Sequence, residues 1–174
     1  MPNAMQACEP ARRLSIPSKS RRRIRWVERW YLDICCLKRP FDDQRQARVR
    51  EEATAVASIV ARAEGGELDL VRSPAHLVEN DANPREDRRL AAALWIDGAA
   101  VGVGTDPEVE SRARQLAALG FSPLDALHLA YAEKADATTF LTCDDQLLRL
   151  AERHRSDLEI SVRNPRATTW EREP

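Results

Sequence analysis

From residue 29 onward, short apolar runs alternate with longer segments in which apolar residues recur at helical spacing. The apolar runs predict buried strands over residues 29–36, 67–72, 99–103, 138–142 and 158–162. The segments between them predict helices over residues 44–64, 73–82, 85–96, 105–119, 122–134 and 144–154. Strands separated by helices imply right-handed crossovers and helices on both faces of the sheet. The pattern therefore predicts an α/β protein, a three-layer α/β/α sandwich around a mostly parallel central sheet.

The ends of the chain differ in composition from this regular body. Residues 1–28 are rich in proline, serine and arginine and show no sustained apolar period. We therefore expect a basic, flexible N-terminal extension. An alternative is a basic arm that contacts RNA phosphates. Residues 29–166 then form one domain, and residues 167–174 form a short C-terminal tail.

Length, hydrophobicity and charge narrow the class of protein. A chain of 174 residues with 43% hydrophobic residues can bury a core without disulfides. It has no apolar run near the roughly 20 residues that cross a bilayer and no apolar stretch typical of a secretory signal. We therefore expect a soluble, cytoplasmic protein with no membrane association. Residues 1–30 carry eight basic side chains and two acidic ones, so the rest of the chain is acidic and predicts no uniformly basic groove.

The four cysteines, Cys8, Cys35, Cys36 and Cys143, do not predict a metal site by their spacing. None forms a CxxC pair, the usual half of a structural zinc site. Neighbouring cysteines such as Cys35 and Cys36 rarely bond to each other. We therefore expect all four to be reduced cysteines that pack as small apolar residues, in a reducing compartment.

Four acidic residues mark places where predicted strands and helices meet. Asp33 ends the apolar core of the first strand, and Asp144 directly follows the strand over residues 138–142. Glu79 lies on the helix after the second strand, and Asp125 opens a later helix. Ligands of open α/β sheets bind at the carboxyl ends of the strands. We therefore predict that these four carboxylates converge at one edge of the sheet.

Clustered carboxylates repel one another, which raises their pKa values unless a cation binds between them. One or two Mg²⁺ or Mn²⁺ ions prefer oxygen ligands and can activate water for phosphodiester hydrolysis. Three of the four acids also have a structural explanation. Asp125 follows Ser122 in a capping box, Asp144 can cap a helix, as can Asp145, and Glu79 can be an ordinary glutamate on a helix surface. Asp33 resists such an explanation, since an unpaired carboxylate at the end of a buried strand costs several kcal/mol.

Basic residues after the first strand have two interpretations. The candidates for contact with RNA phosphates are Arg39, Arg45 and Arg48. They can equally form the solvated face of the helix over residues 44–64 and pair with Glu51 and Glu52. The sequence leaves both interpretations open.

His128 lies three residues after Asp125 and therefore on nearly the same helical face. A catalytic or ligand role is one interpretation. We favour the other, a half-buried histidine whose ring nitrogens are satisfied, because hydrolysis by acids and a cation requires no histidine.

Four segments together resemble the PIN-domain nucleases and, within them, the VapC-like toxins of prokaryotic toxin–antitoxin pairs. They read YLDICCLKRPFDDQ, SPAHLVENDANP, FSPLDALHLA and FLTCDDQLL, and the resemblance covers residues 29–166. It implies an α/β/α sandwich and Mg²⁺- or Mn²⁺-dependent cleavage of RNA that leaves a 5′-phosphate. The family acids fall on Asp33, Glu79, Asp125 and Asp144.

The resemblance also implies supporting residues and partners. The family pattern Thr-x-Asp matches Thr142-Cys143-Asp144, which places the fourth acid on Asp144 and leaves Thr142 and Asp145 as possible support. Toxins of this kind usually pair with an antitoxin that blocks the acidic site, often through an arginine. Homodimers are common in the family.

Ile34 departs from the family pattern, in which threonine or serine usually follows the first aspartate. A hydroxyl there would support the carboxylate, so the alternative function is a catalytically weak PIN-like protein that binds RNA or an antitoxin.

Phosphatases with an Asp-x-Asp motif are disfavoured because Asp33-Ile34-Cys35 lacks the second acid. Dinucleotide-binding folds are disfavoured because no GxGxxG loop precedes a helix.

Overall fold

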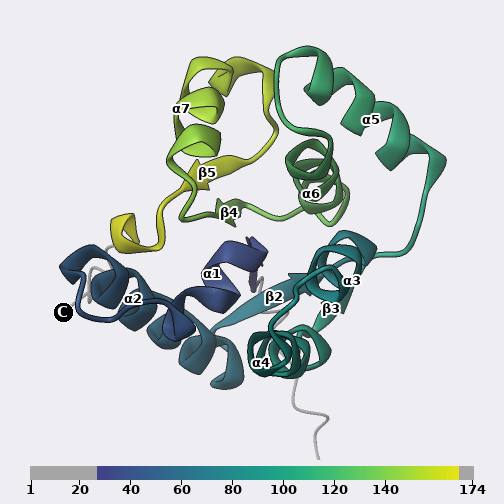
Figure 1. Cartoon of the computed structure of the whole chain (residues 1–174). Coiled ribbons are helices and arrows are strands. Elements are labelled where there is room, and N and C mark those ends of the chain that lie inside the picture. Colours follow the sequence, from purple (N-terminus) through teal and green to yellow (C-terminus); the bar gives the residue numbers. More distant parts are fainter. Residues whose placement is uncertain (1–26, 169–174) are drawn as a thin grey trace, which may run out of the picture.

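The computed structural model of the chain describes residues 27–168, within which five strands form one parallel sheet (Figure 1). The strands are β1 (Glu28–Leu32), β2 (Leu68–Arg72), β3 (Val101–Gly102), β4 (Thr139–Leu141) and β5 (Ser161–Arg163), in the order β3-β2-β1-β4-β5. This sheet confirms the predicted fold class. The basic extension predicted over residues 1–28 lies outside the described residues except at its last two positions, as does most of the tail predicted over residues 167–174.

Helices cover both faces of the sheet, with α1, α2 and α4 on one face and α5, α6 and α7 on the other (Figure 1). The helices are α1 (Ile34–Lys38), α2 (Ala47–Glu64), α3 (Pro74–Asp81), α4 (Glu86–Asp97), α5 (Pro107–Ala118), α6 (Pro123–Lys134) and α7 (Asp145–Arg153). Short 3-10 helices are η1 (Arg39–Phe41), η2 (Arg155–Asp157) and η3 (Pro165–Ala167). Among residues 27–168, no helix has the length and apolar character needed to span a membrane.

The central strand β1 is buried on both faces of the sheet. Its side chains alternate, so that Tyr31 packs in the core beneath α5, α6 and α7, whereas Trp30 and Leu32 pack in the core beneath α1, α2 and α4. Phe140 of β4 stacks on Tyr31 with ring centroids 5.2 Å apart. Burial on both faces explains why this strand reads as a continuous apolar run instead of an alternating one.

The first strand is shorter than the apolar run predicted. We predicted a strand over residues 29–36, but β1 ends at Leu32 and α1 begins at Ile34. Asp33 lies between them in an extended conformation, with φ −58° and ψ 150°. The run remains apolar because α1 buries three of its five residues. Periodicity alone cannot separate a short buried helix from a buried strand, so the prediction was wrong at this boundary.

The strand order places the topological switch point of the sheet between β1 and β4. The chain passes from β1 to β2 on one side, whereas β4 joins β1 on the other side. In parallel sheets this switch point, at the carboxyl ends of the strands, is where ligands bind. Asp33 follows β1 and residues 142–144 follow β4, so the fold brings these two segments together.

Candidate active site

Asp33 and Thr142 form the centre of the candidate site. The backbone N–H of Asp33 donates to the carbonyl oxygen of Leu141 at 2.9 Å. The Thr142 hydroxyl donates to Asp33 Oδ2 at 2.7 Å and accepts from the backbone N–H of Asp144 at 3.1 Å. Because Thr142 is fully buried, it holds the Asp33 carboxylate in one orientation and links it to the segment that carries Asp144.

Burial dominates the electrostatics of Asp33, which is 7% exposed. Burial raises the pKa of Asp33 well above its ordinary value, and the neighbouring Cys35 raises it further. The hydrogen bond from Thr142 and the charge of His128 lower the pKa but do not offset the burial. A cation would favour the ionised form of this carboxyl group. Asp33 is therefore an acid whose charged state requires a positive partner.

Glu79 of α3 reaches the same place as Asp33. Oxygens of these two carboxylates and a ring nitrogen of His128 all lie within 4.8 Å of one another. His128 Nε2 is 3.0 Å from Glu79 Oε2, and Lys38 Nζ is 3.8 Å from Oε1. Burial raises the pKa of Glu79, but the hydrogen bond and charge of His128 and the charge of Lys38 outweigh it, so the pKa falls below its ordinary value. Two carboxylates and an imidazole therefore face one point.

A chain of buried hydrogen bonds fixes the His128 ring, which is 1% exposed. Ser73 Oγ lies 2.6 Å from the Tyr31 hydroxyl, which lies 2.7 Å from His128 Nδ1. A carboxylate only accepts hydrogen bonds, so Nε2 donates to Glu79, and in the neutral imidazole the Tyr31 hydroxyl donates to Nδ1. The fixed imidazole thus orients the Glu79 carboxylate.

Asp125 and Asp144 lie at the starts of α6 and α7 and are not part of the 4.8 Å group. The Ser122 hydroxyl donates to Asp125 Oδ2 at 2.6 Å, and Asp144 Oδ1 accepts from two backbone N–H groups of α7 at 2.6 and 3.2 Å. Burial raises the pKa of Asp125, and the charges of Asp144 and Glu79 raise it further. These acids are therefore coupled electrostatically, although Asp144 also caps its helix.

A match to a family model identifies the kind of domain that carries these acids. The PIN domain model matches residues 48–153, which is more than half of the chain. The chain belongs to the PIN domain family. The matched segment of this PIN domain contains Glu79, Asp125 and Asp144, and Asp33 precedes it. No curated protein matches the chain.

A solved structure, that of FitAcB from Neisseria gonorrhoeae, is similar to this PIN domain. The match has a TM-score of 0.50 and 16% sequence identity. It covers 78% of this chain and 97% of the FitAcB chain. At this identity the match shows a shared fold alone.

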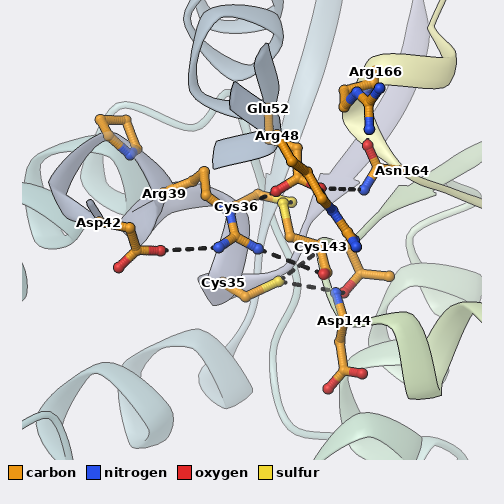
Figure 2. A network of polar contacts seen from close by, with 12 residues as sticks. Cys35, Cys36, Arg39, Asp42, Arg48, Glu52, Cys143, Asp144, Asn164 and Arg166 are labelled. Atoms are coloured by element: carbon orange, nitrogen blue, oxygen red, sulfur yellow. Dashed lines mark hydrogen bonds and ion pairs between the residues drawn. The ribbon is translucent and has the colours of Figure 1, made fainter. Parts of the chain in front are cut away.

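Two of the predicted RNA-contacting arginines pair with one buried carboxylate in this PIN domain (Figure 2). Arg39 Nε lies 2.9 Å from Glu52 Oε2, and Arg48 Nε lies 2.9 Å from Oε1. Asn164 Nδ2 donates to the same Oε1 at 2.8 Å. Glu52 is fully buried, so the two guanidinium charges compensate a carboxylate inside the protein, and its hydrogen bonds run from Arg48 and Asn164 to Oε1. The pairing with Glu52 matches one of the two interpretations that the sequence left open.

The remaining candidates at this edge also form ion pairs. Arg48 donates to both oxygens of Asp145, at 2.5 and 2.7 Å, so Asp145 faces α2 and not the Asp33 carboxylate. Arg45 forms an exposed pair with Asp43 at 2.9 Å. Of the two residues suggested as support, Thr142 contacts an acid of the site, whereas Asp145 contacts an arginine.

The sequence did not reveal the contact between His128 and Glu79. We favoured a half-buried, satisfied histidine, and the structure places a fully buried one whose two nitrogens are both hydrogen-bonded. The signal available was its position on the same helical face as Asp125. Its other partner, Tyr31, and Ser73, which contacts Tyr31, lie far away along the chain, so no local pattern predicts this arrangement.

Proposed function

We propose that this PIN domain is a metal-dependent endoribonuclease that hydrolyses RNA phosphodiester bonds. The observation that supports it most directly is the meeting of Asp33, Glu79 and His128 at the switch point of the sheet. Charge coupling extends this group to Asp125 and Asp144. Acids that gather in this way suit hydrolysis by an activated water, which needs no covalent nucleophile.

The donor groups fit a hard divalent cation, Mg²⁺ or Mn²⁺, which prefers carboxylate oxygens. The raised pKa values of Asp33 and Asp125 indicate that their charged forms need a positive neighbour. When bound, such an ion lowers the pKa of a coordinated water and offsets charge on the phosphodiester oxygens. Thr142 orients the first carboxylate, and His128 orients Glu79.

The decisive experiment incubates the purified protein with labelled total RNA in the presence of Mn²⁺, Mg²⁺ or EDTA. The matched control is the double variant Asp33→Asn, Asp125→Asn, which preserves side-chain volume and removes two charges. We expect cleavage with either metal, no cleavage in EDTA, and none by the double variant. If the folded wild-type protein cleaves RNA with neither metal, the proposed nuclease activity is excluded.

Resemblance to the VapC-like toxins supports a role as the toxin of a type II toxin–antitoxin pair. The expected partner is an antitoxin that covers the acidic site, with an arginine paired to its carboxylates, and the toxin itself is expected to be a homodimer. Induced expression in a bacterial host should arrest growth, and the double variant should not. If both strains grow equally although the protein cleaves RNA in vitro, the nuclease activity would stand and the role as a toxin would be excluded.

Ile34 motivates the alternative of a catalytically weak binding domain, but its surroundings favour the nuclease. Ile34 is fully buried beneath α2 and α4, and Thr142 already donates a hydroxyl to Asp33. We expect Ile34→Thr to lower the free energy of unfolding by about 1–2 kcal/mol, because it loses apolar volume and buries a hydroxyl. The cleavage rate should not rise. Thermal unfolding and initial cleavage rates test this, and a rate increase of about tenfold would instead support the weak-binding alternative.

His128 is expected to act through Glu79 by orienting it. His128→Leu should weaken Mn²⁺ binding by about 10–100-fold, as loss of a hydrogen bond to a metal ligand typically does. His128→Gln should restore part of the affinity, because its amide can still donate to Glu79. Titration calorimetry measures both. The control is His154→Gln, at the end of α7 beside Asp157. Equal affinities for all four proteins would assign His128 a packing role only.

A further inference from the structure

Three thiol groups gather beside the acids (Figure 2). Their spacing in the sequence had suggested separate cysteines that only pack as small apolar residues. Cys35 and Cys36 lie at the start of α1, and Cys143 follows β4. Their sulfur atoms all lie within 4.8 Å of one another, and the Sγ atoms of Cys36 and Cys143 are 3.7 Å apart. The cluster exists because β1 and β4 are parallel neighbours, so the segments that follow them meet.

Cys36 and Cys143 belong to the hydrophobic core beneath α1, α2 and α4, whereas the Cys35 sulfur makes polar contacts. The Cys35 thiol donates to Asp33 Oδ2 at 3.1 Å, and its sulfur lies 3.3 Å from Thr142 Oγ1. The backbone N–H of Cys143 donates to Cys35 Sγ at 3.1 Å. Arg39 Nη2 lies 3.5 Å from the Cys143 carbonyl oxygen and brings a positive charge to this side of the cluster.

The spacing of the sulfur atoms suits a thiophilic ion. Zinc binds cysteine sulfur at about 2.3 Å in tetrahedral sites, so two sulfur ligands of one zinc are about 3.8 Å apart. The 3.7 Å between Cys36 and Cys143 matches this value, and Cys35 is close enough to complete a face of the tetrahedron after a small rotation. Cys36 is fully buried, whereas Cys35 is partly exposed and gives an ion access from solvent.

We propose that Cys35, Cys36 and Cys143 form a three-thiolate site for a thiophilic divalent ion such as Zn²⁺ or Cd²⁺. Binding releases three thiol protons and forms three metal–sulfur bonds, which leaves a net charge of −1 beside Arg39. A water molecule completes the tetrahedron. Soft sulfur ligands select such ions over Mg²⁺, so this site is chemically distinct from the acidic site and does not depend on the proposed nuclease activity.

Cadmium titration of the reduced, full-length chain tests the proposal through the ultraviolet absorption of thiolate-to-cadmium charge transfer. All proteins carry Cys8→Ser, so the cluster holds the only cysteines in the sequence. We expect one Cd²⁺ per chain, retained in excess Mg²⁺. Cys36→Ser and Cys143→Ser should each weaken binding by at least about tenfold, since losing a ligand exceeds the typical effect of losing a ligand's hydrogen-bond partner. Asp33→Asn should keep the absorption, which separates this site from the acidic one.

A second measurement covers the case in which a buried cysteine variant fails to fold. Alkylation of Cys35 in the Cys8→Ser protein, followed by mass spectrometry, should be slowed by at least about tenfold with equimolar Zn²⁺ relative to the metal-free protein, because a metal-bound thiolate reacts poorly. Absence of charge-transfer absorption with equimolar Cd²⁺ would overturn the site. So would Cys35 alkylation that Zn²⁺ leaves unchanged.

Discussion

Replacing Asp33 with asparagine is expected to abolish metal-dependent cleavage while making the metal-free protein more stable. Loss of one carboxylate from the cation site should reduce the cleavage rate by at least about a hundredfold. In EDTA at neutral pH, the same change removes a buried carboxyl group whose ionisation is unfavourable and should raise the free energy of unfolding by about 1–2 kcal/mol, or the melting temperature by roughly 3–6 °C. Added Mn²⁺ should stabilise the wild type and not Asp33→Asn.

The raised pKa of Asp33 makes this stability difference depend on pH. Folded Asp33 holds its proton more tightly than unfolded Asp33, so the folded protein loses stability as pH rises from the unfolded pKa, about 3.9, through the folded value. Asparagine does not titrate. The advantage of Asp33→Asn should therefore vanish below about pH 3.9 and be complete above the folded pKa.

Thermal unfolding in EDTA at several pH values measures this dependence. Asp43→Asn is the matched control, because Asp43 forms an exposed ion pair with Arg45 and the substitution should leave the melting temperature essentially unchanged. A metal-free Asp33→Asn protein less stable than the wild type at neutral pH would show that hydrogen bonds from Thr142 and Cys35 outweigh the burial of charge.

The elements that the sequence predicted well are those with local signals. The helix predicted over residues 122–134 corresponds to α6 (Pro123–Lys134), because Ser122 caps it and proline occupies its first turn. The helix predicted over residues 144–154 corresponds to α7, which Asp144 caps. In both cases the residue that begins the helix is fixed by hydrogen bonds within a few positions, so a single sequence contains the information.

Contacts that depend on the packing of distant segments had no such signal. His128 meets Glu79 across 49 positions of the chain, and Cys36 meets Cys143 across 107. The sequence predicted that strand ends gather at one edge but not which side chains touch there. Nor did the sequence predict that Glu52 is buried. Its burial follows from the contacts of α2 with η1 and η3, which are not local in the sequence.

Glu52→Ala is expected to be the most destabilising of the substitutions considered. Glu52 is fully buried and forms ion pairs with Arg39 and Arg48, both at 2.9 Å, so its loss leaves two cations without their shared partner. Removing one partner of a buried ion pair typically costs about 3–5 kcal/mol. The hydrogen bond to Asn164 is also lost, which loosens the C-terminal segment from α2. Thermal and urea-induced unfolding of the metal-free protein measure the effect.

The neighbouring Glu51 supplies the control, because its ion pair with Arg166 is exposed on both sides. Glu51→Ala should therefore change stability by about 1 kcal/mol or less. The comparison also tests the two interpretations of the arginines. If Arg39 and Arg48 serve mainly to neutralise Glu52, then Arg48→Ala should lower stability more than it lowers RNA affinity. An Arg48→Ala protein of unchanged stability that binds RNA about tenfold more weakly would instead assign this arginine to the substrate, and the buried carboxylate would then serve to position it.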